Sequence, residues 1–322
     1  MEKTRSLSNL IQSARGFQES RLLLTALELD VFATVGEGAT VAEVARTLGT
    51  DPRATEMLLN ALVAVDALHK REAVFHCTVE SKALGPARPG LLHTVHLWDT
   101  WSSLTECVKT GRAVRSRGPE SFPEARTRAF IAAMHARAQD SAQDTVRLSG
   151  IRDAKQMLDV GGGSGAFSIA FAKACPDLQA EILDLGAVVP LAEEYIREAG
   201  LQDRVRVRPG DMRTAELGEG FDLVLLSAVC HMFGEDENRS LIQRCARALV
   251  RGGHLVIREF ILQNDRTGPP HAALFALNML VGTDRGNTYT EGQYRAWMEE
   301  AGLGAITRAD PKGDVLVATK LG

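Results

Sequence analysis

Leu158-Asp159-Val160-Gly161-Gly162-Gly163-Ser164-Gly165-Ala166-Phe167 is the stretch that decides the fold of this chain. It joins a short apolar segment, residues 155–160, to a segment of small and apolar residues, 161–175, that has the pattern of a helix. Glycines between a strand and a helix let the backbone turn tightly and let a ligand approach the main chain without meeting a Cβ atom. The stretch therefore predicts a ligand-binding loop within a strand–helix unit.

Strands and helices alternate from this loop to the end of the chain. Expected strands cover residues 155–160, 180–185, 204–212, 221–229 and 254–262, with helices at 161–175, 190–200, 237–250 and 289–302. Two short alternating segments surround Asp310-Pro311-Lys312-Gly313 and suggest an antiparallel edge. This order predicts an α/β fold, a Rossmann-like doubly wound domain over residues 151–322 with a mostly parallel sheet.

The first hundred residues have a different pattern. An apolar stripe of helical spacing covers residues 16–32, and Thr40 with Glu43 has the spacing of a capping box. Asp51 and Pro52 are placed to begin a third helix, and residues 69–79 alternate like a strand pair. Helices followed by a β ribbon predict a winged-helix domain over residues 1–100.

Residues 101–150 are expected to form connecting helices, interrupted at Gly111 and around 119–123. We expect these helices, together with segment 271–283, to supply apolar and aromatic walls of a pocket for a flat small molecule. The candidates for this lining are Trp98, Trp101, Phe130, Met134, Phe275, Asn278 and Met279.

Composition narrows the class of protein. With 322 residues, 45% hydrophobic and 24% charged, the chain suits two globular domains. A net charge of −4 argues against a broad surface for nucleic acid. The sequence has no signal-like or membrane-spanning apolar run, and its five scattered cysteines suggest reduced thiols, so a cytoplasmic protein is expected. His93 and His96 lack an evident third ligand, so no metal is expected.

Three acids follow the ends of successive expected strands. Asp159 stands just before the glycines, where its carboxylate can accept hydrogen bonds from a cationic amino group, whereas an anionic pyrophosphate would gain nothing there. Asp184, with Leu185 beside it, lies about 20 residues past the loop, where an acid can hold ribose hydroxyls. Asp211 and Met212 offer an acceptor and an apolar flank to an adenine ring. Together with Gly161, Gly163 and Gly165, these residues predict a site for S-adenosylmethionine.

The glycine loop alone leaves a second possibility open. Gly161, Gly163 and Ala166 also fit the G-x-G-x-x-A fingerprint of dinucleotide-binding domains. An NAD-dependent dehydrogenase is therefore a competing interpretation.

Several segments together resemble the successive motifs of the small-molecule O-methyltransferases. They are LDVGGGSGAF at 158–167, LDL at 183–185, GDM at 210–212, SAVCHMF at 227–233 and VIREFIL at 256–262. The family is typified by caffeic acid and acetylserotonin O-methyltransferases and by bacterial antibiotic-tailoring relatives, and the resemblance covers nearly the whole chain. It implies a homodimer formed through the winged-helix domain, with S-adenosylmethionine converted to S-adenosylhomocysteine and no metal.

The resemblance also assigns roles near the fourth and fifth strands. His231 matches the general base that takes a proton from an acceptor hydroxyl, and Glu259 matches the acid that orients it. Ser227 is implied to lie along the cofactor and Phe233 to stack on adenine. The expected reaction is O-methylation of a small aromatic or polyketide-like acceptor.

Two departures from the family pattern keep another chemistry open. Met232 follows the histidine where relatives often have aspartate, and Thr288 stands where many relatives place a second glutamate. A hydroxyl cannot supply the charge of a carboxylate, so C- or N-methylation working mainly by proximity is the alternative. A winged-helix DNA-binding regulator is a more remote one, because residues 52–68 contain one arginine and otherwise mostly apolar or acidic residues, which suits a dimer contact better than a DNA groove.

Overall fold

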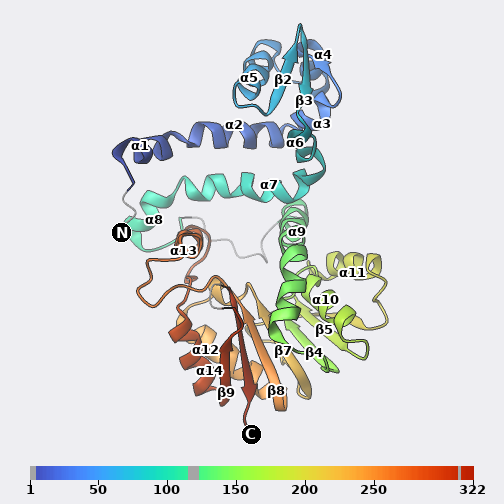
Figure 1. Ribbon diagram of the computed structural model, residues 1–322, viewed down its shortest axis with the longest axis vertical. Helices are drawn as coiled ribbons and strands as arrows, with labels where there is room; N and C mark the ends of the chain where they lie inside the picture. Colours follow the sequence, from blue (N-terminus) through green and yellow to red (C-terminus); the bar gives the residue numbers. More distant parts are fainter. Residues whose placement is uncertain (1–4, 115–122, 311–312) are drawn as a thin grey trace. The chain divides into compact units, whose positions relative to one another are not determined.

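The computed structural model describes residues 5–114, 123–310 and 313–322. The chain divides into two compact units, Met1–Trp98 and Asp99–Gly322, which are described separately (Figure 1). The expected interruption around 119–123 falls mostly outside the described residues, whereas Gly111 ends a helix with a left-handed backbone, as expected.

The first unit combines short helices with a small antiparallel sheet. Its elements are α1 (Leu7–Arg15), α2 (Phe17–Glu28), α3 (Val31–Val35), β1 (Ala39–Thr40), α4 (Val41–Leu48), α5 (Pro52–Ala64), β2 (Leu68–Arg71), β3 (Val74–Cys77), α6 (Val79–Lys82) and most of α7 (Leu84–Trp101). The strand order is β1-β3-β2. Helices α3 to α5 followed by the β2–β3 hairpin confirm the winged-helix pattern.

Local signals set the helix boundaries in this unit. Thr40 and Glu43 form the expected capping box at α4, and Asp51 accepts a hydrogen bond from Ala54 N–H at the start of α5. The single helix expected over 16–32 is wrong in one respect, because Asp30 has a left-handed backbone (φ 65°) and divides it into α2 and α3.

The second unit is the α/β domain. It contains α8 (Leu104–Thr110), α9 (Glu124–Ser149), β4 (Gln156–Val160), α10 (Ala166–Ala174), β5 (Gln179–Asp184), α11 (Val189–Glu198), β6 (Val205–Pro209), β7 (Phe221–Ser227), the 3₁₀ turn η2 (Cys230–Met232), α12 (Glu235–Ala248), β8 (Leu249–Arg258), α13 (Pro270–Gly282), α14 (Glu291–Glu300), β9 (Leu303–Arg308) and β10 (Val315–Lys320).

Within its described residues, seven strands form one sheet in the order β6-β5-β4-β7-β8-β10-β9. Strands β4 to β8 are parallel, while β10 pairs antiparallel with both β8 and β9. This confirms the mostly parallel sheet with an antiparallel edge. The strand order reverses at β4, so the carboxyl ends of β4 and its neighbours face a crevice, as in other doubly wound sheets.

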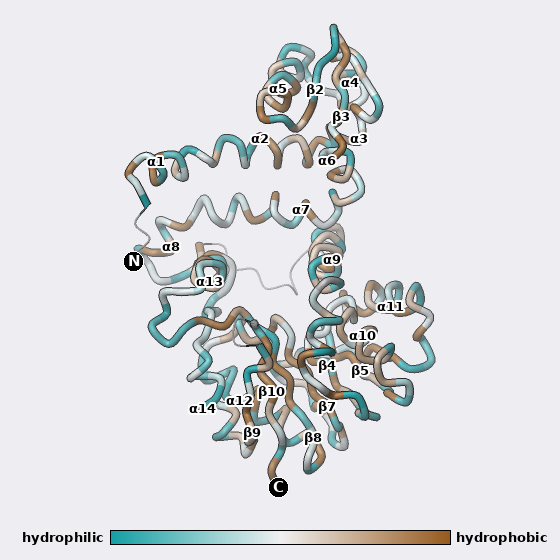
Figure 2. The backbone as a smooth tube through the Cα atoms, viewed as in Figure 1, coloured by the Kyte–Doolittle hydropathy of each residue, from teal (hydrophilic) through white to brown (hydrophobic). Residues whose placement is uncertain are grey.

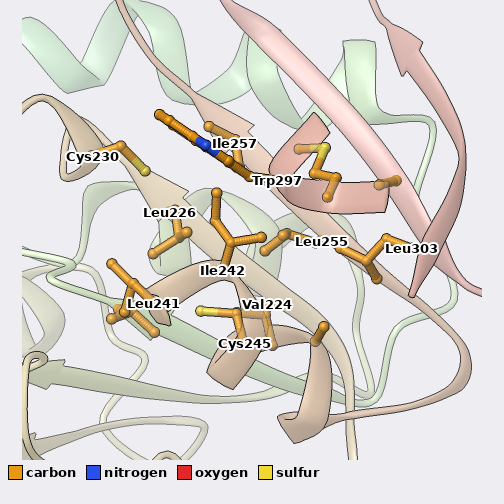
Figure 3. Packing of buried hydrophobic residues seen from close by; sticks show 14 of the residues in the cluster. Val224, Leu226, Cys230, Leu241, Ile242, Cys245, Leu255, Ile257, Trp297 and Leu303 are labelled. Carbon is orange, nitrogen blue, oxygen red and sulfur yellow. The ribbon is translucent and has the colours of Figure 1, made fainter. Parts of the chain in front are cut away.

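Alternating side chains of the central strands pack against helices on both faces. In β7, Leu223 and Leu225 join the core beneath α9, α10 and α11, whereas Val224 and Leu226 join the core beneath α12 and α14. Figure 2 shows hydrophobic colour concentrated along these strands. Figure 3 shows the second core, where Ile242 and Cys245 meet Leu226 and Leu255. The packed sheet gives a rigid edge on which a site can be built.

Two strands differ from the sequence pattern, because the fifth, expected over 254–262, is Leu249–Arg258 and the third is shorter than expected. The third strand of this domain, expected over 204–212, is Val205–Pro209, so Asp211 and Met212 lie in the turn beyond it. No helix among the described residues combines the length and apolarity needed to cross a membrane.

Candidate active site

The glycine loop lies between β4 and α10, at the carboxyl end of the sheet. Gly161 has φ +72°, and a Cβ atom there would lie 2.7 Å from Met212 Cε and 2.8 Å from Val229 Cγ2. The loop therefore contacts the turns that follow β6 and β7. Gly163 has φ +59°, and its N–H donates to Asp184 Oδ2 at 2.7 Å. Only residues without a Cβ fit these two positions readily, so the close approach expected of the loop is built into its backbone.

Asp159 lies beneath the loop and is completely buried. Its Oδ2 accepts a hydrogen bond from Ser168 Oγ at 2.7 Å, while Oδ1 has no hydrogen-bond partner among the described residues. Burial raises the pKa of Asp159 to about 7. A buried carboxylate oxygen without a partner is costly, and a cationic donor would remove that cost. The residue therefore fits the amino end of S-adenosylmethionine.

Asp184 connects the loop to the end of β5. Its Oδ2 accepts from Gly163 N–H, and its Oδ1 accepts from the N–H of Leu185 at 2.7 Å. Burial raises the pKa of Asp184, against the opposing effect of these two hydrogen bonds. The carboxylate predicted to hold ribose hydroxyls thus also fixes the loop, a role that the sequence pattern did not indicate.

Asp211 has a partner within the chain. Its carboxylate forms an ion pair with Arg213, with 2.6 Å between Oδ2 and the guanidinium, and this contact lowers the pKa of Asp211. Both side chains are partly exposed, so the pair contributes little stability and leaves the carboxylate open to exchange of partners. The prediction that Asp211 accepts a hydrogen bond from adenine stays a prediction.

Met212 and Phe233 line one cavity of about 340 Å³ beside Asp211. Arg244 of α12 shapes its wall, because its guanidinium donates to the carbonyls of Met212 (2.7 Å) and Ala215. Arg244 was not predicted, because in the sequence it is one more charge on an amphipathic helix. The rest of the lining is mostly charged or polar, including Asp236, Glu237 and Ser240, and the glycine loop contributes no residue to it.

Ser227 is the last residue of β7, next in the sheet to Arg258 of β8. Its Oγ is buried and has no hydrogen-bond partner among the described residues. Like Asp159 Oδ1, it is a buried polar atom that a ligand at the strand ends can satisfy. Two such atoms at one sheet edge indicate that the residues present suit a polar nucleoside.

His231 lies in the turn η2, directly after β7, and is 7% exposed. Its Nδ1 lies 2.9 Å from Glu259 Oε2, and its backbone N–H donates to Glu259 Oε1 at 3.3 Å. Glu259 follows β8 and is 2% exposed. The backbone carbonyl of His231 accepts from Asn287 N–H at 2.9 Å. The predicted pair is thus brought together, with the histidine held at both its ring and its main chain.

Aromatic side chains surround the imidazole. Phe275 meets the His231 ring edge-on, with 4.9 Å between centroids, and Phe260 lies at 5.8 Å. Phe260 and Phe275 stack on each other at 3.9 Å. Phe275 was expected in the pocket, whereas Phe260 was missed although it directly follows Glu259. This grouping places an apolar aromatic wall beside the histidine.

Thr288 occupies the position of the second family glutamate. It is 1% exposed, and its hydroxyl donates to the carbonyl of Ala272 at 3.1 Å. Among the described residues, Glu259 is the one acid that hydrogen-bonds His231. The threonine therefore anchors the first turn of α13 instead of supplying a charge.

The remaining pocket candidates lie in different surroundings. In the second unit, Trp101 Nε1 donates to Asn278 Oδ1 at 2.9 Å, and Met279 is buried in the same helix as Asn278. Phe130 packs with the cluster around Ile131 and Leu191, and Met134, on the same helix, is half-buried. Trp98 belongs to the first unit, where the guanidinium of Arg21 lies 5.5 Å from the centre of its ring. Of these candidates, Phe275 makes a ring contact with His231, and Trp101 and Asn278 contact each other.

A second histidine at this edge was not predicted. His135 of α9 lies 2.8 Å from Ser164 Oγ in the glycine loop and stacks on Tyr195 of α11. The two hydrogen-bonded residues are 29 positions apart, and no local spacing signals such a contact.

The chain is similar to known proteins over most of its length. Residues 101–304 match the model of the O-methyltransferase domain, and residues 11–84 match the O-methyltransferase dimerisation domain. The chain is 33% identical over 317 residues to a 3-hydroxy-5-methyl-1-naphthoate 3-O-methyltransferase of Streptomyces sahachiroi, covering 92% of this chain and 89% of that protein. It is 31% identical over 320 residues to acetylserotonin O-methyltransferase of Bos taurus, covering 92% of each chain.

Solved structures share the fold. An O-methyltransferase family protein from Burkholderia thailandensis aligns with a TM-score of 0.89 at 24% identity over 99% of both chains. Human N-acetylserotonin methyltransferase in complex with S-adenosylmethionine aligns with a TM-score of 0.85 at 22% identity over the full length of both. The dimerisation domain implies a homodimer, and the competing dehydrogenase interpretation is wrong. The chain belongs to the O-methyltransferase family with an N-terminal dimerisation domain, and it is an S-adenosylmethionine-dependent methyltransferase that acts on small molecules.

Proposed function

We propose that this methyltransferase methylates a hydroxyl group of a small aromatic or polyketide-like acceptor, with His231 as general base and Glu259 as its orienting acid. The observation that supports it most is the buried 2.9 Å contact between His231 Nδ1 and Glu259 Oε2 at the strand edge. The relative from Streptomyces sahachiroi is named for O-methylation of a naphthoate, a flat aromatic molecule, which favours the same acceptor class.

The donor would be held by residues at the ends of four strands. Asp159 and the glycine loop would take its amino end, Asp184 its ribose, and Asp211, Met212 and Phe233 its adenine, with Ser227 along its length. Bound there, S-adenosylmethionine supplies an electrophilic methyl group on a positively charged sulfur. No metal is required, because that leaving group departs neutral.

The chain's own residues supply positioning and proton transfer. Because Glu259 holds Nδ1–H, the free Nε2 of His231 is the atom that can take a proton from an acceptor hydroxyl. The charge on Glu259 then stabilises the imidazolium. General base catalysis of this kind typically contributes about 10²–10⁴-fold, and alignment of the reactants supplies much of the remainder.

The surroundings of His231 also select the acceptor. Phe275 and Phe260 present aromatic surface beside the ring that accepts the proton. The helices of residues 101–150 would complete the pocket, and the winged-helix domain of residues 1–100 would form the homodimer rather than a DNA-binding surface. An electrophoretic retardation assay with random DNA at low salt would reveal DNA binding.

C- or N-methylation remains the second candidate because Thr288 supplies no charge to the histidine. An N,N-dimethyltransferase of Streptomyces rimosus is 30% identical over 314 residues, so N-methylation occurs among relatives of this chain. Incubation with S-adenosylmethionine and a panel of phenols, indoles, amines and quinones, followed by mass spectrometry, separates the candidates. Methyl groups on phenolic oxygen support O-methylation. Products methylated only on nitrogen or carbon would contradict it and favour the second candidate.

A further inference from the structure

His135 reaches the glycine loop from outside it. Its Nδ1 lies 2.8 Å from the hydroxyl oxygen of Ser164, which is 3% exposed and stands between Gly163 and Gly165. Ser164 comes from the loop after β4, while His135 belongs to α9. A single hydrogen bond thus links this helix to the backbone turn that would hold the donor.

The imidazole of His135 is fixed on its other sides. It stacks on Tyr195 of α11, with 3.8 Å between centroids and 15° between planes, and its Nε2 lies 3.0 Å from Gln139 Nε2. Desolvation lowers the pKa of His135, which favours a neutral ring with one donating and one accepting nitrogen. Because three contacts hold the ring, its rotation is already restricted before the donor binds, and its contact with Ser164 is preorganised.

α9 also comes near the loop at a second point. Ile131 Cδ1 lies 4.0 Å from where a Cβ atom of Gly163 would be. Ile131 and His135 are four residues apart and share one face of the helix. From the opposite side, Gly163 N–H donates to Asp184. The Gly163–Ser164 segment is therefore hydrogen-bonded to α9 through His135 and to the end of β5 through Asp184.

We propose that His135 is a positioning residue for the methyl donor: it holds Ser164, and through Ser164 the glycine loop, in the conformation that binds the donor. The proposal rests on the placement of the donor at the glycine loop given under the proposed function. It concerns donor binding and not proton transfer, so its consequences differ from those of changing His231.

Four variants test it by calorimetry with S-adenosylhomocysteine. His135→Phe keeps a ring to stack on Tyr195 but removes both nitrogens, and Ser164→Ala removes the partner hydroxyl. Each should weaken binding by about three- to tenfold, the range of one hydrogen bond of ordinary net strength. The double variant should bind S-adenosylhomocysteine no more weakly than the poorer binder of the two single variants, because each substitution removes the same contact. His135→Asn, which places a polar atom near the Nδ1 position, should restore most of the affinity.

The matched control is Gln143→Ala, on α9 and lining the same 640 Å³ cavity as His135, without a contact to Ser164. It should bind like the wild type. In steady-state assays the His135→Phe variant should raise the KM for the donor while kcat changes by less than about twofold. If His135 only supported the fold, the variant would lower the melting temperature without raising the KM for the donor selectively.

Circular dichroism and melting temperature establish that each variant folds; should His135→Phe not fold, Ser164→Ala supplies the same comparison. Folded His135→Phe and Ser164→Ala variants that bind with wild-type affinity, or losses that add in the double variant, would overturn the proposal. A wild-type protein that does not bind S-adenosylhomocysteine would instead refute the placement of the donor itself.

Discussion

His231 Nδ1 and Glu259 Oε2 lie 2.9 Å apart, although the two residues follow different strands and are 28 positions apart in the chain. The backbone N–H of His231 also donates to the other oxygen of the same carboxylate. Two contacts to one buried acid fix both the orientation and the tautomer of the imidazole, which leaves Nε2 as the free nitrogen.

Replacement of this acid by its amide tests the role of its charge. Glu259→Gln should lower kcat by about tenfold, because hydrogen bonds to charged groups contribute about 1.5–3 kcal/mol and neutral ones about 0.5–1.5 kcal/mol. Affinity for S-adenosylhomocysteine should not change. Single-turnover kinetics and calorimetry measure the two quantities, and an unchanged kcat would show that Glu259 only supports the fold.

Thr288→Val tests whether Thr288 only holds the first turn of α13 in place or also takes part in catalysis. The variant keeps the side-chain shape but removes the hydrogen bond that the Thr288 hydroxyl donates to the carbonyl of Ala272, so the free energy of unfolding should fall by about 1 kcal/mol. The kcat should stay close to that of the wild type. Urea denaturation and steady-state assays check both statements, and a fall in kcat of more than about tenfold would place Thr288 in the chemistry instead.

Asp159 predicts a specific pH dependence of donor binding. Its pKa is raised by burial to about 7, so in the ligand-free protein the carboxylate becomes ionised as the pH rises through that value. A cationic amino group pairs with the ionised form, and affinity for S-adenosylhomocysteine should therefore increase between about pH 5.5 and 7. Calorimetry in two buffers of different ionisation enthalpy should also detect proton release.

Asp159→Asn is the control for that dependence, since it should bind more weakly and show no such rise. The raised pKa also makes the ligand-free wild type lose stability as the pH rises from about 4 to about 7, because over that range the unfolded chain releases the proton more readily. The amide variant should show a smaller decline, because Asp184, whose pKa is also raised by burial, keeps its own contribution. A wild-type affinity that is constant over the interval would contradict the pairing of Asp159 with the donor.

Phe275→Ala tests the aromatic wall. The variant removes the ring that meets His231 edge-to-face, and loss of such a pair typically costs about 0.5–1.5 kcal/mol. The kcat/KM for an aromatic acceptor should therefore fall by about three- to tenfold, while the KM for the donor stays constant. Leu274→Ala, an exposed position on the same helix, is the matched control. If both variants were equally active with aromatic acceptors, Phe275 would not contribute to the acceptor pocket.

The sequence predicted those parts of the site that depend on local spacing or on family motifs. The glycine loop, Asp159 and Asp184 lie where strand ends place them, because parallel strands bring their carboxyl ends to one edge. His231 and Glu259 were assigned by resemblance, and the structure brings them into contact.

Other features depend on packing between segments distant in the chain. The contact of His135 with Ser164, and that of Arg244 with the carbonyl of Met212, join a helix to a loop without any periodic signal. The break at Asp30 was missed because a left-handed residue leaves the apolar stripe of a helix intact. Such details follow from tertiary packing, which overrides local propensity.

In the proposed reaction, His231 takes the proton from an acceptor hydroxyl. The most direct test is the single-turnover rate of methyl transfer by His231→Ala with a phenolic acceptor, alongside calorimetry with S-adenosylhomocysteine. We predict a rate about 10²–10⁴-fold below that of the wild type, with donor affinity nearly constant. A variant that retains the full rate would contradict the assignment and favour a reaction driven by proximity alone.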